Sequence, residues 1–454
     1  MVIGGGPGGY VAAIRAAQMG AEVALVEKDE VGGTCLNWGC IPTKALVAGA
    51  ETLHRIRCSE EFGIHVGEVS IDFARLVERK DAVVKKLVTG VQFLLKKNKI
   101  ELIRGTAKLA GTGKVVVDLK DGGTLECETE NIILATGTRP ALIPAWGYDG
   151  ERVITSNEAL SLKEVPGELL IIGGGVIGCE FACIFAEMGC QVTIVEAMSS
   201  ILPLVERDAA RQMQTLLKRK GITIKTKVKI EKVEKTADKV IAHLEGGEAI
   251  AADKMLISIG RTMNTSGLGL EEAGVILGHR GEVVVDEYLK TSVPGIYAIG
   301  DITGKVQLAH VASTQAMVAV ENMMGHTRKM DYDVVPSCIF TMPEMAGVGL
   351  TIQQCEEKGL KPKVGKFPFM ASGKAATMGE TDGFVKILAD TETDKVLGVH
   401  MVGPHATDLI AEAALAIKLG ATVEQITNVI HAHPTLAEVI MEAAEAVHGR
   451  AIHI

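Results

Sequence analysis

Two glycine-rich segments with the same internal spacing constrain the fold of this chain more than any other feature. Each has the form Gly-x-Gly-x-x-Gly, and each lies between a short apolar run and a helical pattern. The glycines are Gly4, Gly6 and Gly9 in the first segment, and Gly173, Gly175 and Gly178 in the second. A glutamate ends the next apolar run in both copies, and Glu27 and Glu196 each lie 23 positions after the first glycine (27 − 4 and 196 − 173).

This repeated spacing predicts two Rossmann-type units, each with its own dinucleotide. The first glycine permits a tight turn, the second lets the backbone approach a pyrophosphate, and the third lets the helix pack on the strand. Free amides and the dipole at the helix N-terminus then favour the anion. A carboxylate at the strand end accepts hydrogen bonds from a ribose diol and repels a 2′-phosphate. Glu196 therefore favours NAD over NADP in the second unit.

Two cysteines, Cys35 and Cys40, follow the first unit within the segment from Gly33 to Lys44. Structural zinc sites usually combine two closely spaced ligand pairs, and the chain has no second cysteine pair of that kind, so we predict no metal site. A thiol pair beside a dinucleotide site instead predicts sulfur redox chemistry coupled to an electron carrier. Pro42 indicates a helix start, so Cys40 faces the positive end of a helix, and Lys44 adds charge that stabilises a thiolate.

Chain length, apolar runs, net charge and the remaining cysteines exclude several classes of protein. The 454 residues are enough for three or four domains, and no run of about 20 apolar residues is present, so we expect no membrane span. The net charge of −9 and the lack of a basic run make a nucleic-acid partner unexpected. No signal peptide precedes the short first strand at Met1–Ile3, so a cytoplasmic location is expected. The other cysteines are expected to be reduced and buried: Cys58, Cys127, Cys179, Cys183, Cys190, Cys338 and Cys355.

Three strand-end turns complete the pattern. The apolar run from Val293 leads into Gly300-Asp301, where an acid could hold a ribityl or ribose hydroxyl. The turns at Thr136-Gly137 and Gly260-Arg261 mark places where the chain leaves or re-enters a nucleotide-binding domain.

Together with the C-terminal segment His433-Pro-Thr-Leu-Ala-Glu438, these motifs resemble the pyridine nucleotide–disulfide oxidoreductases over essentially the full length. The redox segment and Glu196 point to the lipoamide-type branch of that family. The resemblance implies an α/β fold with two Rossmann-like dinucleotide-binding domains and a C-terminal α+β dimerisation domain. The implied boundaries are 1–145 for the FAD-binding domain, 146–262 for the NAD-binding domain, 263–333 for a central segment completing the FAD region, and 334–454 for the interface domain.

The resemblance also implies roles for individual residues. FAD would occupy the first unit and NAD the second. Cys40 would be the thiol nearest the flavin, and Cys35 the interchange thiol that meets the substrate. Lys44 would lie near the reactive flavin nitrogen with Glu180 as its partner, and His433 would be the acid–base group oriented by Glu438. Further implied cofactor contacts are Gly33, Thr34, Thr136, Gly137, Gly260, Arg261, Gly300, Asp301, Ala309 and His310.

The implied reaction is the oxidation of dihydrolipoamide by NAD⁺, in a 2-oxo acid dehydrogenase or glycine cleavage complex. The implied assembly is a homodimer in which His433 reaches the other subunit's disulfide, with a lipoyl-bearing acyltransferase or a glycine-cleavage carrier protein as partner. His431, in contrast, is expected to be a packing or solvent-facing residue.

Three alternative functions fit the sequence less well. An NADPH-dependent reductase of the glutathione reductase type would need arginines after Glu196, where the chain has Ala197, Met198, Ser199 and Ser200. A mercuric reductase needs a C-terminal cysteine pair, but the last cysteine is Cys355. A purely structural role in a large complex does not need the intact set of two cysteines, histidine and glutamate.

Overall fold

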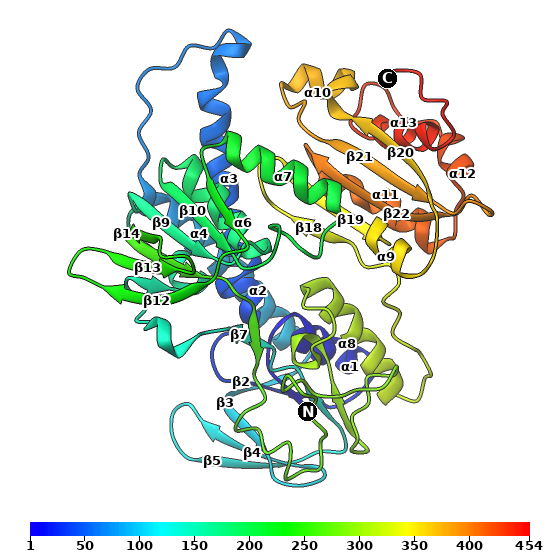
Figure 1. Cartoon of the computed structure of the whole chain (residues 1–454). Helices are drawn as coiled ribbons and strands as arrows, with labels where there is room; N and C mark the ends of the chain where they lie inside the picture. Colours follow the sequence, from blue (N-terminus) through cyan, green and yellow to red (C-terminus); the bar gives the residue numbers. More distant parts are fainter.

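The computed structural model describes all residues from 1 to 454 and shows three parts (Figure 1). The first part, here called the first Rossmann unit, is built on a seven-stranded sheet. In spatial order its strands are β17 (Ile296–Ala298), β6 (Ile132–Leu134), β1 (Val2–Ile3), β2 (Ala24–Glu27), β3 (Glu101–Leu109), β4 (Lys114–Leu119) and β5 (Thr124–Glu128). The first five strands are parallel, and β3, β4 and β5 form an antiparallel meander at one edge.

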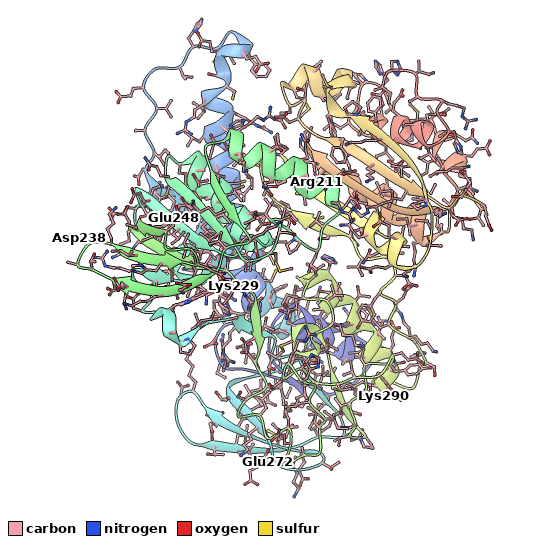
Figure 2. The ribbon with its side chains drawn as sticks, viewed as in Figure 1. Arg211, Lys229, Asp238, Glu248, Glu272 and Lys290 are labelled. Atoms are coloured by element: carbon pink, nitrogen blue, oxygen red, sulfur yellow. The ribbon has the colours of Figure 1, made fainter.

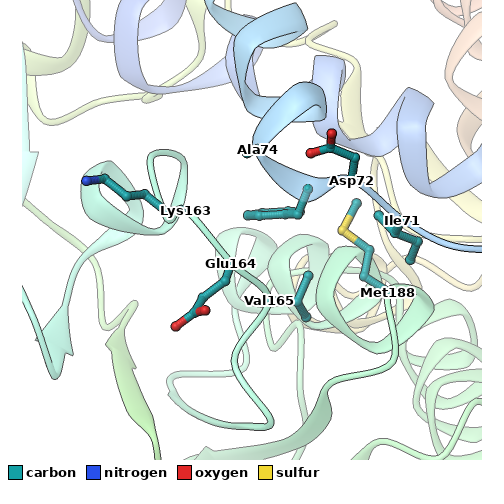
Figure 3. Close-up of a pocket in the computed structure, with 8 residues that line it drawn as sticks. Ile71, Asp72, Ala74, Lys163, Glu164, Val165 and Met188 are labelled. Atoms are coloured by element: carbon teal, nitrogen blue, oxygen red, sulfur yellow. The ribbon is translucent and has the colours of Figure 1, made fainter.

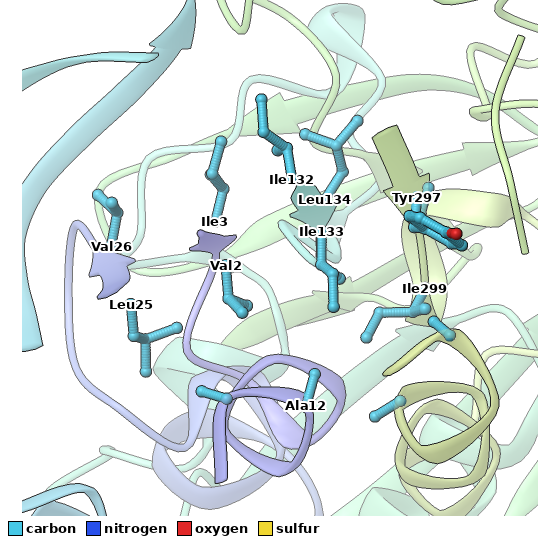
Figure 4. Packing of buried hydrophobic residues seen from close by; sticks show 14 of the residues in the cluster. Val2, Ile3, Ala12, Leu25, Val26, Ile132, Ile133, Leu134, Tyr297 and Ile299 are labelled. Carbon is cyan, nitrogen blue, oxygen red and sulfur yellow. The ribbon is translucent and has the colours of Figure 1, made fainter. Parts of the chain in front are cut away.

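Strand β1 has only two residues, yet it lies at the centre of this sheet. Val2 pairs with Leu25 on one side and Ile133 on the other, and Ile3 has neighbours on both sides in the same way. Both side chains are almost completely buried, among the residues shown in Figure 4. Burial of each such side chain contributes roughly 1.5–3 kcal/mol. The short strand is therefore held by partners on both sides.

The second Rossmann unit contains a five-stranded parallel sheet and a three-stranded antiparallel sheet. The parallel strands are β11 (Thr223–Thr226), β10 (Gln191–Glu196), β9 (Glu168–Ile172), β15 (Lys254–Ile257) and β8 (Val153–Ile154). The antiparallel strands are β12 (Ile230–Lys235), β13 (Val240–Leu244) and β14 (Ala249–Ala252). The chain crosses between the two units along an antiparallel pair formed by β7 (Thr138–Pro140) and β16 (Arg261–Met263).

Helices cover the sheets of both units. They are α1 (Pro7–Gln18), α2 (Gly33–Trp38), α3 (Cys40–Arg57), α4 (Phe73–Lys97), α5 (Ser156–Ala159), α6 (Val176–Glu187), α7 (Arg207–Arg219) and α8 (Ala309–Met323). Helix α1 packs against α8, and α3 packs against both α4 and α6, which joins the two units. Helix α1 begins at Pro7, because the fixed φ of proline is preorganised for the first helical position.

The third part, the C-terminal domain, is a five-stranded antiparallel sheet covered by helices (Figure 1). Its strands in spatial order are β18 (Ser337–Ile339), β19 (Glu344–Gly349), β22 (Val396–Gly403), β21 (Phe384–Ala389) and β20 (Lys363–Pro368). Its helices are α9 (Ile352–Glu357), α10 (Gly373–Met378), α11 (Ala406–Lys418), α12 (Val423–Thr427) and α13 (Glu438–Val447). Short 3-10 helices lie at η1 (Ser59–Phe62), η2 (Pro144–Trp146), η3 (Gly300–Thr303) and η4 (Phe369–Ala371).

The α/β fold class expected from the sequence is confirmed, with parallel sheets in the Rossmann units and an α+β C-terminal domain. None of the helices combines the length and the apolar character that a membrane span requires. Charged side chains of both signs are spread over the exterior, as the six labelled in Figure 2 illustrate.

The expectation for the cysteines outside the redox segment is partly wrong. All nine cysteines are free, and Cys179, Cys183, Cys190 and Cys355 are buried as expected. Cys58, however, is exposed, because it follows the last residue of α3 at the surface end of that helix. Cys127 and Cys338 are half-buried.

Candidate active site

The two glycine turns are built almost identically. Gly4 has φ +102° and Gly173 has φ +103°, a conformation that residues with a Cβ rarely adopt. A Cβ on Gly9 would lie 1.7 Å from the carbonyl oxygen of Gly4, and a Cβ on Gly178 would lie 2.1 Å from that of Gly173. The first glycine therefore makes the turn, and the third lets the helix approach it.

Glu27 and Glu196 occupy the same position in the two units, and both are buried at the end of a strand. Each carboxylate accepts two backbone amides, one on each oxygen, at 2.7 Å. The donors are Gly5 and Asp29 in the first unit, and Gly174 and Met198 in the second. These bonds compensate for burial of the charge and fix the carboxylate beside the turn. Each oxygen retains acceptor capacity for a ribose hydroxyl.

The middle glycine of each turn faces space that a Cβ would enter without collision. A Cβ on Gly175 would meet no atom within 4 Å, and one on Gly6 would meet only the Cα of Gly33, at 3.9 Å. Open space over a helix N-terminus is what a bound pyrophosphate requires. The residues present therefore fit a dinucleotide in both units. In the first unit, Gly33 at the start of the redox segment borders that space.

The two redox cysteines lie on consecutive helices. Cys35 is in α2, and Cys40 is the first residue of α3, so its sulfur lies at a helix N-terminus. A hydrogen bond from the Cys35 thiol lowers the pKa of Cys40 to about 7, with Lys44 acting in the same direction and the partial desolvation by surrounding protein atoms opposing both, although Cys40 is exposed at the surface. The same hydrogen bond and burial raise the pKa of Cys35 above its ordinary value. In the reduced pair, Cys40 therefore loses its proton more readily than Cys35.

Lys44 lies one helical turn after Cys40 and pairs with Glu180 of the second unit. The Lys44 Nζ is 2.8 Å from both carboxylate oxygens of Glu180. The Glu180 side chain is only 5% exposed, so this ion pair is screened little by water. A residue that the sequence analysis missed, Phe340, completes the group: its N–H donates to Glu180 Oε1 at 2.9 Å, and its ring centroid is 4.4 Å from Lys44 Nζ.

The turn at Asp301 is tied to the crossing between the two units. Thr138 donates its hydroxyl to Asp301 Oδ2 at 2.7 Å, and Arg261 Nε is 3.9 Å from the same oxygen. Arg261 Nη2 also lies 3.5 Å from the Thr34 hydroxyl, next to Cys35. The structure thus brings together Thr34, Arg261 and Asp301, which are far apart in the chain. Thr138 was missed, although it directly follows the predicted Thr136-Gly137 turn.

Two further predicted positions are held by structural hydrogen bonds. The Thr136 hydroxyl donates to the Asn264 carbonyl at 2.8 Å, and the Asn264 amide returns a bond to the Thr136 carbonyl at 2.9 Å. The Gly300 amide donates to Gln315 Oε1 at 2.6 Å, and Gln315 is completely buried. These bonds fix the strand-end turns in place. The Thr136 hydroxyl is already used within the protein.

The histidine–carboxylate pair lies in the C-terminal domain. His433 Nδ1 is 2.8 Å from Glu438 Oε1, and the His433 side chain is 78% exposed. Burial raises the pKa of Glu438, but the Thr435 amide and His433 outweigh it, so the pKa lies below its ordinary value. None of the hydrogen bonds of His433 reaches the redox segment of the same chain. His431 has a buried side chain bonded to Glu412 at 2.9 Å, which agrees with its expected packing role.

The remaining predicted contacts lie around the start of α8 and the two crossing turns. Ala309 is the first residue of α8, and His310 Nε2 is 3.0 Å from the Pro336 carbonyl oxygen. Gly137 and Gly260 have φ of +65° and +126°, and a Cβ on either would meet no atom within 4 Å. The structure therefore leaves the space beside both turns open.

A cavity of about 520 Å³ lies apart from these residues, between the start of α4 and the segment before β9 (Figure 3). Its lining residues are Ile71, Asp72, Phe73, Ala74, Lys163, Glu164, Val165 and Met188. None of them was predicted as a site residue. No motif in the sequence points to this cavity.

Comparison with known families agrees with this geometry. The family model described as pyridine nucleotide-disulphide oxidoreductase matches residues 1–316, and the dimerisation domain of the same family matches residues 335–444. The chain belongs to the pyridine nucleotide-disulphide oxidoreductases, enzymes that use FAD and a pyridine nucleotide. The match to the dimerisation domain supports a homodimer.

Curated relatives place the chain within this family more closely. It is 45% identical to a protein of Bacillus subtilis and 46% identical to one of Thermus scotoductus, and each match covers all of this chain and 98% of the relative. A mitochondrial relative from Pisum sativum is 42% identical, with 100% and 92% coverage. All three relatives are named dihydrolipoyl dehydrogenase.

Solved structures give the same fold. The crystal structure of LpdA from Mycobacterium tuberculosis is similar with a TM-score of 0.93 and 29% identity, covering 98% of both chains. The HOCl-induced flavoprotein disulfide reductase RclA from Escherichia coli is similar with a TM-score of 0.88 and 31% identity, covering 99% of both chains.

Proposed function

We propose that the protein oxidises dihydrolipoamide to lipoamide and reduces NAD⁺ to NADH, through a redox disulfide formed by Cys35 and Cys40. The observation that carries the proposal is the pair itself. Two sulfurs lie within hydrogen-bonding reach, one of them has a pKa lowered to about 7 at a helix start, and both lie beside a dinucleotide turn. The names of the relatives support dihydrolipoyl groups as the substrate.

The proposed division of the chain assigns residues 1–145 and 263–333 to FAD, 146–262 to NAD, and 334–454 to the dimer interface. The turn around Gly6 and the Glu27 carboxylate would hold FAD, and the turn around Gly175 with Glu196 would hold NAD. When bound, FAD accepts the two electrons from the reduced cysteine pair and passes them to NAD⁺. A buried carboxylate at position 196 disfavours the 2′-phosphate of NADP.

The protein side chains would carry out the thiol chemistry. His433, oriented by Glu438, removes a proton from one substrate thiol, because only the thiolate is nucleophilic. That thiolate attacks Cys35, the Cys35–Cys40 bond breaks, and Cys40 leaves as a thiolate. The second substrate thiol then closes the lipoamide ring and releases Cys35. The substrate loses two electrons, and the cysteine pair gains them.

The Lys44–Glu180 ion pair would influence the ionisation of Cys40. Lys44 favours the thiolate form by its charge, while Glu180 holds the lysine in place at 2.8 Å. A lower pKa also makes Cys40 a better leaving group when the substrate thiolate attacks Cys35.

The proposed assembly is a homodimer in which one protomer's His433 serves the thiol pair of its partner. The high exposure of His433 supports this arrangement, since the imidazole is accessible on the surface of the C-terminal domain. A lipoyl-bearing acyltransferase or a glycine-cleavage carrier protein would deliver the substrate. A cytoplasmic location is part of the proposal, supported by nine free cysteines.

The test is NADH formation from dihydrolipoamide by the flavin-loaded protein and by the variant Cys40→Ser. We expect the variant to retain flavin and lose dithiol oxidation. Cys58→Ser, which removes an exposed thiol outside the redox segment, serves as the matched control and should keep wild-type turnover. Full activity in Cys40→Ser, or preference for NADPH with glutathione disulfide, would contradict the proposal.

A further inference from the structure

One aromatic residue of the C-terminal domain touches both members of the ion pair beside Cys40. We propose that Phe340 is a positioning residue for the thiol site: its ring and its backbone N–H together hold the Lys44–Glu180 pair where Lys44 acts on Cys40. The inference rests on the proposed function, because it concerns the same cysteine. It adds a third part of the fold to a site otherwise made by the two Rossmann units.

The ring acts on the lysine. Two N–H directions of Lys44 point at the two oxygens of Glu180, both at 2.8 Å, and the Phe340 ring lies 4.4 Å from the same nitrogen. The Lys44 side chain is 29% exposed, so the ammonium has lost much of its water. A cation over an aromatic face is stabilised more strongly when it is desolvated. The ring thus restricts Lys44 to one side of Glu180.

The backbone acts on the glutamate. The Phe340 N–H donates to Glu180 Oε1 at 2.9 Å, and the same oxygen accepts from Lys44. This amide is presented by the residue directly after β18, in a chain segment that ends in a buried Thr341. A buried carboxylate with three donors keeps one orientation, whereas one with fewer donors rotates to find others. The backbone N–H is retained in any substitution of Phe340, so the effect of the ring can be tested separately.

The position of Lys44 matters to Cys40 because neighbouring groups of both signs influence the pKa of that thiol. Cys35 of α2 and Lys44 of α3 lower the pKa of Cys40, whereas Glu180 of α6 raises it. The charge of Arg261 in β16 also acts on Cys40, the charge of Asp301 in η3 raises the pKa of Cys35, and Lys44 lowers the pKa of Cys338 in β18. Lys44 and Glu180 therefore oppose each other at Cys40, and their balance depends on how close the ammonium lies to the sulfur.

The test compares Phe340→Leu, which keeps an apolar side chain without the ring, with Phe340→Tyr, which keeps the ring. The flavin-loaded protein is reduced, and the rate of Cys40 alkylation by iodoacetamide is measured against pH, with peptide mass mapping to separate Cys40 from Cys35. Wild type is expected to show a midpoint at pH about 7. Phe340→Leu should raise that midpoint by roughly half a unit to one unit, and Phe340→Tyr should restore it.

A matched control is available in the same domain. Phe384 also lies under a lysine, with Lys366 Nζ 3.8 Å from its ring centroid, whereas the hydrogen bonds and the cation–π contact of the Lys44–Glu180 pair involve Phe340 and not Phe384. Phe384→Leu should leave the Cys40 midpoint unchanged even where it lowers thermal stability. Equal midpoints in wild type, Phe340→Leu and Phe340→Tyr would overturn the inference, as would equal shifts in both Phe340 variants. NADH formation from dihydrolipoamide by the wild-type protein tests the proposed function separately. If the wild-type protein forms no NADH, the proposed function is overturned and the inference about Phe340 is not.

Discussion

The two Rossmann units share one turn and differ in what surrounds it. Their first glycines have φ of +102° and +103°, and their strand-end glutamates accept two amides each at 2.7 Å. In the first unit, however, the redox segment returns to the turn, and a Cβ on Gly33 would lie 2.6 Å from the Cα of Gly6. In the second unit the space beside Gly175 stays open. The motif thus sets the turn, and the neighbouring segment sets the chemistry.

The segment after the strand-end glutamate is where the two units diverge. After Glu27 the chain forms α2 and α3, which carry the thiol pair and Lys44. After Glu196 it runs to α7, where Glu206 at the N-cap and Asp208 in the first turn each bond the buried Lys386 of the C-terminal domain at 2.7 Å. This segment carries the thiol pair in one unit and contacts the C-terminal domain in the other.

The largest effects on stability and dinucleotide binding are expected at the third glycine of each turn, where the two turns are most alike. Gly9→Ala and Gly178→Ala each place a Cβ about 2 Å or less from a carbonyl oxygen, at 1.7 Å and 2.1 Å. Because both neighbours are backbone, relief requires the helix to move away from the strand, at a cost of more than about 3 kcal/mol. We expect Gly9→Ala to be purified without flavin, and Gly178→Ala to keep flavin and lose NAD⁺ binding. Absorption spectra and NAD⁺ titration measure the two losses, and an identical loss in both variants would contradict the comparison.

Glu27→Gln and Glu196→Gln are expected to have smaller effects of similar size. Each glutamine keeps one oxygen acceptor but turns an NH₂ group toward a buried backbone N–H, which leaves a donor unsatisfied at a cost of about 1–3 kcal/mol. Both variants should therefore melt at lower temperature than wild type, by similar amounts in calorimetry. Only Glu196→Gln should weaken NAD⁺ binding, and only Glu27→Gln should weaken flavin retention. A glutamine variant that melts at the wild-type temperature would show that the hydrogen bonds from the backbone amides to this carboxylate do not contribute to stability.

Local pattern was enough to predict these turns. The glycine spacing and the strand-end acids predicted both units, because the close approach of the third glycine to the first and the amide bonds of the glutamate lie within a segment of about 25 residues. The backbone of Ala135 and Ser258, which borders the first glycine of each turn, comes from distant segments. The helix start near Cys40 was also indicated by a local signal, Pro42. The exposure of Cys58 could not be predicted from local pattern, since the sequence at a helix end gives little signal of whether solvent or protein covers that end.

Contacts between distant segments were not readable from the residues alone. The pairing of Lys44 with Glu180 was expected only because the chain resembles a known family, and it joins residues 136 positions apart. Phe340 was missed, because a phenylalanine after a short strand looks like any core residue. Its role depends on how the C-terminal domain is placed against α3 and α6, and the sequence pattern does not specify that placement.

Charge substitutions at the Lys44–Glu180 pair test the thiol site, which only the first unit carries. We expect them to shift the pKa of Cys40 by about one unit, or about 1.4 kcal/mol. The Cys40 thiolate predominates above pH about 7 and is lost as the pH falls below that value. Lys44→Met removes a favourable charge and should raise the midpoint of Cys40 alkylation, whereas Glu180→Gln removes an unfavourable charge and should lower it. Lys44→Arg keeps the charge and is the control. Shifts of the same sign in the first two variants would show that packing, not charge, governs Cys40.

The smallest effect on stability is expected at the middle glycines, where the two turns differ in their surroundings. A Cβ at Gly175 meets no atom within 4 Å, and one at Gly6 meets only Gly33 at 3.9 Å, so Gly175→Ala and Gly6→Ala should both melt within a few degrees of wild type. Their backbone is already extended, with φ of −75° and −69°, so alanine introduces no strain.

Each methyl group would nevertheless occupy the space proposed for a pyrophosphate. Gly175→Ala should therefore weaken NAD⁺ binding about tenfold or more at unchanged flavin content, and Gly6→Ala should release flavin. Calorimetry with ligand titration separates the two properties. A variant that binds its dinucleotide as tightly as wild type would mean that the open space beside that turn is not where the pyrophosphate lies.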